Sequence, residues 1–175
     1  VTCESLTRLV AAELEGEIRF GGRNLLNLSE SHLRDVRGSG IAHVFQNPQS
    51  ALDPVYSVGA QVREAVERNR EVSREEARDI AVDLLDRVGI PDAATRYDDY
   101  PHEFSGGQTQ RVVVALALSG DPELLIADEP TTALDVTIQA QILDLLRDLQ
   151  DEREMGIIFV THDLGVAAQV DDRMV

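Results

Sequence analysis

The chain has 175 residues, which is enough for one hydrophobic core with a small additional subdomain. It carries 32 acidic against 16 basic residues, so its net charge is −16. This balance argues against binding to nucleic acid or to anionic membranes, because both partners attract basic patches. No apolar stretch approaches the ~20 residues that span a bilayer, and the single Cys3 excludes an internal disulfide.

The same composition is typical of proteins adapted to very high salt. Every basic residue is an arginine, and aromatic residues make up only 4% of the chain. At molar salt the Debye length falls to ~3 Å, so a dense acidic surface repels itself little. We therefore expect a halophilic source. The opening residues 1–5 lack a basic region and an initiator methionine, which indicates a piece of a longer chain rather than a signal peptide.

In chain order, the hydrophobic pattern first predicts a helix over residues 1–14. A short strand over residues 16–20 follows, and the pair Gly21-Gly22 closes it as a turn. Residues 41–45 are a second short apolar segment, and we expect a strand there too.

The pattern then turns helical over residues 58–89. Ser73 and Glu76 form a capping box inside this region, in which each side chain satisfies a free backbone donor of the other residue. Gly89 and Pro91 are typical stop signals, so the helical region is predicted to end there.

Beyond a solvated loop at residues 97–100, a helix is predicted over residues 106–118. Residues 124–127 and 157–160 are apolar enough to be central strands. The helix between them has one apolar face, formed by Ile138, Ile142, Leu145, Leu146 and Leu149. The resulting β-α-β unit, which should cross over right-handedly, predicts an α/β fold with parallel strands.

Asp128 and Glu129 stand where the first of these central strands ends. A buried parallel strand delivers such acids to the carboxyl edge of the sheet, where ligands bind. Nucleotide-bound magnesium takes carboxylate ligands, and water attacking a γ-phosphate needs a positioned proton acceptor. The alternative without chemistry is a strand followed by an N-capping acid and by Pro130 at a turn.

Ser105, Gly106, Gly107 and Gln108 stand at the start of an apolar helix. The two glycines let backbone N–H groups and one hydroxyl approach an anion without a Cβ in the way, which suits phosphate. An ordinary Ser-Gly helix start would have the same sequence.

His162 follows the second central strand. A histidine there can donate a hydrogen bond to a γ-phosphate and hold the attacking water, whereas a lone histidine is more often a satisfied core or capping residue. Asp135 precedes a helix that begins near Thr137, and it could serve only as the cap of that helix.

Residues 105–108 and the strand ending in Asp128 and Glu129 together resemble the signature loop and the Walker B strand of ATP-binding cassette (ABC) ATPases. The resemblance implies ATP and Mg²⁺ as cofactors, with Asp128 for the metal and Glu129 as the general base. It also implies that the signature loop completes the nucleotide site of an opposite subunit, in a head-to-tail homodimer or heterodimer. Thr109 departs from the family, which more often has a basic or amide residue there.

Three further residues match motifs of this family. Gln46 matches the Q-loop glutamine, which senses magnesium and water and is implied in both metal binding and catalysis. His162 matches the switch histidine, which is implied in catalysis. Asp135 matches the D-loop, which contacts the other subunit and belongs to the nucleotide site.

Longer segments are similar to the ATPases of peptide and nickel importers, namely residues 45–54, 100–104, 127–149 and 161–166. This likeness covers nearly the whole chain. It implies a peripheral subunit on the cytoplasmic face of the cell membrane, joined to transmembrane permease subunits and indirectly to an extracytoplasmic solute-binding protein, with no nucleic acid partner. Exporters and lipoprotein-release systems share the same cassette.

The phosphate-binding loop G-x-x-x-x-G-K-[ST] does not occur, and the chain contains no lysine. In the family this loop and its lysine make most triphosphate contacts. We therefore expect the N-terminal part of the cassette to be missing, the parent protein to hydrolyse MgATP, and this chain to bind it poorly. The resemblance implies a P-loop-NTPase-like α/β cassette with a mostly parallel central sheet plus a small helical subdomain. It divides the chain into a partial ATPase core, residues 1–57 and 121–175, and the helical subdomain, residues 58–120, which includes the signature loop.

Two alternatives stay open at this point. ABC ATPases of DNA maintenance insert long coiled coils between the Q-loop and the signature, but only the 58 residues 47–104 lie there, without sustained heptads. A degenerate, non-catalytic cassette or regulatory fragment is favoured by the missing lysine.

Overall fold

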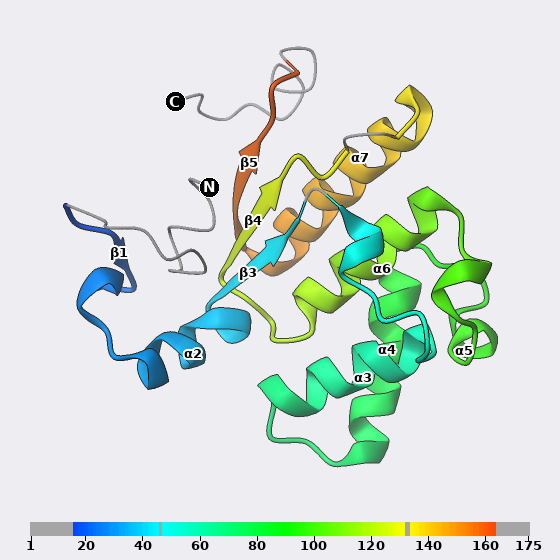
Figure 1. Ribbon diagram of the computed structural model, residues 1–175, viewed down its shortest axis with the longest axis horizontal. Coiled ribbons are helices and arrows are strands. Elements are labelled where there is room, and N and C mark those ends of the chain that lie inside the picture. Colours follow the sequence, from blue (N-terminus) through cyan, green and yellow to red (C-terminus); the bar gives the residue numbers. More distant parts are fainter. Residues whose placement is uncertain (1–15, 46, 132–133, 164–175) are drawn as a thin grey trace.

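The computed structural model describes three stretches of the chain, residues 16–45, 47–131 and 134–163. Their centre is a parallel sheet of three strands in the order β3 (Ile41–Val44), β4 (Leu124–Asp128) and β5 (Gly156–Val160) (Figure 1). Ile41 lies opposite Leu124, and Leu124 lies opposite Gly156. β4 is therefore the middle strand, paired along both of its edges.

The remaining elements surround this sheet. The α-helices are α2 (Glu30–Ser39), α3 (Val58–Asn69), α4 (Arg74–Arg87), α5 (Ala93–Arg96), α6 (Gly106–Leu118) and α7 (Val136–Arg153). Short 3-10 helices lie at Leu25–Asn27, Pro48–Ser50 and Pro101–Glu103. An antiparallel hairpin is formed by β1 (Arg19–Phe20) and β2 (Arg23–Asn24).

The two faces of the sheet bury different sets of side chains, because successive residues of a strand point to opposite faces. Ala42, Val44 and Leu125 belong to the main core, which they share with apolar residues of α3, α4, α6 and α7. Ile41 and Ile126 belong to a smaller core with residues of α2 and of the segment before it. The sheet is thus covered on both faces, as parallel sheets require.

Most predicted elements are confirmed, with shifted ends. The helical region over residues 58–89 is two helices, α3 and α4, and the capping box begins the second one. Glu76 accepts a hydrogen bond from the Ser73 N–H at 2.8 Å, and Ser73 Oγ accepts one from the Glu76 N–H at 3.2 Å. The hydrogen bonds to Ser73 lower the pKa of the Glu76 carboxyl. Gly21 and Gly22 both have positive φ, which suits the two-residue turn of the β1–β2 hairpin.

The prediction of a solvated loop over residues 97–100 is wrong for Tyr97, which is only 6% exposed. Its ring lies against Gly59, where a Cβ would come within 2.2 Å of it, and the Arg78 guanidinium stacks 4.7 Å from the ring centroid. Burial raises the pKa of the Tyr97 hydroxyl. Tyr97, at the end of α5, therefore packs against both α3 and α4.

Some predictions are not tested by the fold. The helix over residues 1–14 and Gln46 lie outside the described residues. The division into an ATPase core and a helical subdomain also stays a prediction, and the main core runs through sheet and helices alike. Among the described helices, none is both long enough and apolar enough to cross a membrane.

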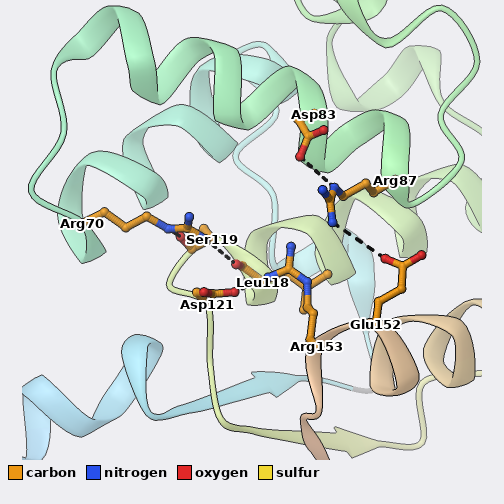
Figure 2. Close-up of polar contacts among 8 residues, drawn as sticks. All are labelled: Arg70, Asp83, Arg87, Leu118, Ser119, Asp121, Glu152 and Arg153. Carbon is orange, nitrogen blue, oxygen red and sulfur yellow. Dashed lines mark hydrogen bonds and ion pairs between the residues drawn. The ribbon is translucent and has the colours of Figure 1, made fainter.

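Arginines tie the helices together beside the sheet (Figure 2). Arg70, which follows α3, donates to the carbonyl oxygens of Ser119 at 2.6 Å and Leu118 at 3.3 Å, at the end of α6. Arg87 of α4 pairs with Asp83 at 2.7 Å in its own helix and with Glu152 of α7 at 3.7 Å. Arg153 of α7 pairs with Asp121, in the turn before β4.

The contacts of Arg70 and Arg87 should contribute differently to the free energy of unfolding. Arg70→Ala should lower the free energy of unfolding by about 2 kcal/mol, because two helix-end carbonyls lose a charged donor. Arg87→Ala should lower it by only about 0.5 kcal/mol, because its ion pairs are exposed. Urea titrations at low salt and at molar KCl would measure both losses. Equal losses, or a loss at Arg70 that vanishes in molar KCl, would contradict this ranking.

Candidate functional site

The acidic pair, Asp128 and Glu129, stands at the carboxyl end of the middle strand. Asp128 is the last residue of β4 and lies opposite Val160 of β5. Glu129 follows with a φ of 49°, in the left-handed region that costs a non-glycine residue about 1–2 kcal/mol. Its backbone N–H donates to the Val160 carbonyl at 2.9 Å, so the pairing with β5 holds this conformation. Strained residues of this kind occur both in turns and at functional sites, and Asp92, Asp121 and Glu154 also have positive φ.

His162 lies against Glu129, although 33 residues separate them in the chain. Its Nδ1 is 3.0 Å from Glu129 Oε1, and its side chain is 74% exposed whereas that of Glu129 is 23% exposed. An ionised carboxylate only accepts hydrogen bonds, so His162 Nδ1 is the donor when Glu129 is ionised. Asp163 N–H donates to Thr161 Oγ1 at 3.0 Å, which tightens the turn around the histidine.

The alternative of an N-capping acid after β4 does not apply to Glu129. The residue that caps α7 is Asp135, whose Oδ1 accepts from the N–H groups of Thr137 at 3.1 Å and Ile138 at 3.0 Å. The capping role that the sequence left open for Asp135 is therefore real. It uses one carboxylate oxygen, and Asp135 is exposed, so a role at a subunit interface is compatible with it.

The signature loop, Ser105, Gly106, Gly107 and Gln108, begins α6. Ser105 is the cap of this helix: its Oγ accepts from Gln108 N–H at 3.4 Å, and Gln108 Oε1 accepts from Ser105 N–H at 3.0 Å. This capping box fixes the loop from within, and Thr109 Oγ1 adds a bond to the Ser105 carbonyl at 3.0 Å. Ser105 and Gly106 are exposed, so the positive end of the helix dipole faces outward.

Sequence reasoning missed two supports of the site. Thr131, two residues beyond Glu129, is 6% exposed and accepts a hydrogen bond from Gln139 Nε2 of α7 at 3.2 Å. Arg111 of α6 donates to the Val88 carbonyl at 2.5 Å and to Gln141 Oε1 at 3.5 Å, and burial lowers the pKa of its guanidinium. The sequence shows only that a polar residue occupies each position, because their partners are distant in the chain.

The donor set fits magnesium bound to a nucleotide rather than a protein-enclosed metal. In the described part of the chain, no cluster of three or more His, Cys, Asp or Glu side chains could enclose an ion. Nucleotide-bound Mg²⁺ needs only one or two carboxylates, since phosphates and water supply the other ligands. Asp128, at the end of β4, can provide one of them, and Gln46, the other predicted metal residue, lies outside the described residues.

A parallel sheet with an acidic pair and a histidine at its carboxyl edge, together with a separate glycine-rich helix start at α6, is typical of nucleotide-binding α/β proteins. The family model described as ABC transporter matches residues 2–132 of the sequence. The chain belongs to the ABC transporter family, and the resemblance seen in its motifs is confirmed.

Two relatives illustrate the likeness. The oligopeptide transport ATP-binding protein OppD of Bacillus subtilis (strain 168) is 50% identical over an alignment of 178 positions, which covers 99% of this chain and 50% of that protein. A Brucella abortus (strain 2308) protein that carries the name of a peptide import ATP-binding protein is 52% identical over an alignment of 176 positions, which covers 99% of this chain and 53% of that protein. The chain spans about half the length of the curated relatives it matches.

Solved structures confirm the predicted fold class. The dimeric, post-hydrolysis structure of the ATP-binding cassette MJ0796 bound to ADP and Pi matches with a TM-score of 0.81 and 30% identity, covering 95% of this chain and 70% of that one. The structure of cbiO1 from Clostridium perfringens, part of the ABC transporter complex cbiONQ, matches with a TM-score of 0.79 and 29% identity, covering 97% and 64%.

The strain at Glu129 predicts an unusual order of stabilities. Glu129→Gly should be more stable than Glu129→Ala by about 1 kcal/mol, because glycine adopts the observed φ of 49° without a Cβ penalty. At an ordinary position alanine is the more stable of the two. Thermal and urea unfolding of both variants would test this, with the same two substitutions at Asp163 as the control. A more stable Glu129→Ala would mean that the left-handed conformation is absent in solution.

Proposed function

We propose that the protein containing this chain hydrolyses ATP to drive a membrane importer, with peptides as the transported class. The observation that supports ATPase activity is the contact between Glu129 and His162 at the carboxyl edge of the sheet. Glu129 Oε1 lies 3.0 Å from His162 Nδ1, and Glu129 has a strained backbone conformation. The importer assignment is supported by 50–52% identity to relatives named for oligopeptide transport and peptide import.

In this proposal each residue of the site has a separate role. Magnesium, when bound, would neutralise phosphate charge, and Asp128 would hold it together with Gln46. Glu129 would accept a proton from the attacking water at its carboxylate, and the His162 ring would orient that carboxylate and hydrogen-bond the terminal phosphate. The water oxygen then bonds to the γ-phosphorus as the bond to the ADP oxygen breaks.

The signature loop would act on a second subunit. Ser105, Gly106, Gly107 and Gln108 present an exposed helix start, whose N–H groups and dipole favour a phosphate. We place it on the nucleotide of a head-to-tail partner cassette, with Asp135 at the same interface. The dimeric state named for MJ0796 supports this arrangement. Permease subunits, a solute-binding protein and the cytoplasmic face of the membrane complete the proposed setting.

The 175-residue chain itself should bind MgATP poorly, because it contains no lysine and no G-x-x-x-x-G-K-[ST] loop. We would measure ATPase activity and MgATP affinity at molar KCl for this chain and for a form extended upstream. Turnover is expected only in the extended form. Tight binding and Glu129-dependent turnover by the chain alone would refute the assigned importance of the missing loop, and no turnover by either form would favour a non-catalytic cassette.

The extended form also tests the catalytic pair. Glu129→Gln and His162→Ala should each lower kcat about 100-fold or more. The double variant should lose far less than the product of the two losses, because residues that act as a unit are not additive. His32→Ala is the matched control, since this exposed histidine also uses Nδ1 in a hydrogen bond, to Ser29 at 2.7 Å. Independent, multiplying losses would argue against a working pair.

A further inference from the structure

The signature loop lies against the first turn of α7, and Figure 1 shows α6 and α7 side by side. A Cβ added at Gly107 would come within 2.6 Å of Ile138 Cγ2, closer than side chains tolerate. At the neighbouring Gly106, the nearest atom to such a Cβ is Leu134 Cδ2 at 3.9 Å, which is ordinary contact. One glycine of the loop is thus required by packing inside the chain, and the other is not.

We infer that Ile138 is a positioning residue for the signature loop: its Cγ2 methyl sets how closely α6 approaches α7. The inference rests on the proposed function, because it concerns how that loop is presented to the nucleotide of a partner subunit. It goes further in giving Gly107 an intramolecular task besides any close approach to phosphate.

Ile138 is suited to act as a rigid stop, by which we mean a side chain that limits how closely α6 approaches α7. Its backbone N–H is fixed by Asp135 Oδ1 at 3.0 Å, and its half-buried side chain packs on the main core. A β-branched side chain in a helix has one strongly preferred χ1 rotamer, so the methyl cannot swing aside. A displacement at this contact must therefore move the helix backbones.

The next residue of α7, Gln139, contacts the segment that follows Glu129. Gln139 Nε2 donates to Thr131 Oγ1 at 3.2 Å, and the Thr131 carbonyl accepts from Leu134 N–H at 3.2 Å. Thr131 follows Glu129 by two residues, so consecutive residues of α7 support the catalytic segment and the signature loop. In a head-to-tail dimer these two segments serve different nucleotides. The start of α7 would therefore couple the two nucleotide sites.

The test uses the extended protein and substitutions that differ in one methyl group. Gly107→Ala should raise the KM for ATP about tenfold and abolish cooperativity in ATP. Adding Ile138→Leu should restore both to within about threefold, because leucine has a single γ carbon that can point away from the new Cβ. Adding Ile138→Val should restore neither, because valine keeps both γ carbons.

Gly106→Ala is the comparator, since within the described part of the chain the nearest side-chain atom to its new Cβ, Leu134 Cδ2, is 3.9 Å away. Any loss that it causes should be unchanged by Ile138→Leu. Should Gly107→Ala fail to fold, Ile138→Ala removes the stop without adding bulk. It should raise KM and reduce cooperativity while kcat changes by less than about twofold.

The outcomes separate this inference from the proposed function. Equal KM values for Gly107→Ala with and without Ile138→Leu, in folded protein that still turns over ATP, would overturn the role of Ile138 and assign Gly107 to the nucleotide alone. An unchanged KM and unchanged cooperativity in Ile138→Ala would overturn it as well. Absence of turnover in the unsubstituted extended protein would instead remove the proposed function.

Discussion

The pairing of β4 on both edges is the constraint on which the rest of the structure depends. Leu125, Ile126 and Ala127 have no exposed surface, and their backbone hydrogen bonds are made to β3 and β5. Because this pairing fixes the register of β4, the position of its last residues is fixed as well. The hydrogen bond from Glu129 N–H to the Val160 carbonyl then holds Glu129 in its left-handed backbone conformation. The polar site follows from the apolar strand, because burial fixes the register that brings Glu129 to His162.

The start of α7 is the second organising element. Asp135 caps it, and its first residues contact the signature loop and the segment behind Glu129. Helix starts expose free N–H groups, and here the cap satisfies two of them while fixing the helix in place. The same short turn can therefore be structural and functional, so the two interpretations of Asp135 do not compete.

The sequence predicted what depends on local pattern. The capping box of Ser73 and Glu76, the helix α6 and the central strands could be placed because their signals lie within a few residues. Contacts across the chain could not: Tyr97 looked like part of a polar loop, yet Gly59 leaves room for its ring 38 positions earlier. The strain at Glu129 was equally hidden, because its positive φ is held by the pairing with β5, which is distant in the chain.

The absence of lysine has a structural meaning beyond net charge. Arg70 donates to two carbonyls at once, and Arg96 stacks 4.0 Å over the Phe104 ring while pairing with Asp99 at 2.9 Å. A planar guanidinium with five donors can do this, whereas an ammonium group cannot stack and fork together. Bonds to carbonyls and rings depend little on long-range charge, so they keep their strength where salt screens surface ion pairs. In a chain of net charge −16, we therefore expect the contacts of Arg70 with carbonyls and of Arg96 with a ring to stabilise the fold at both low and high salt.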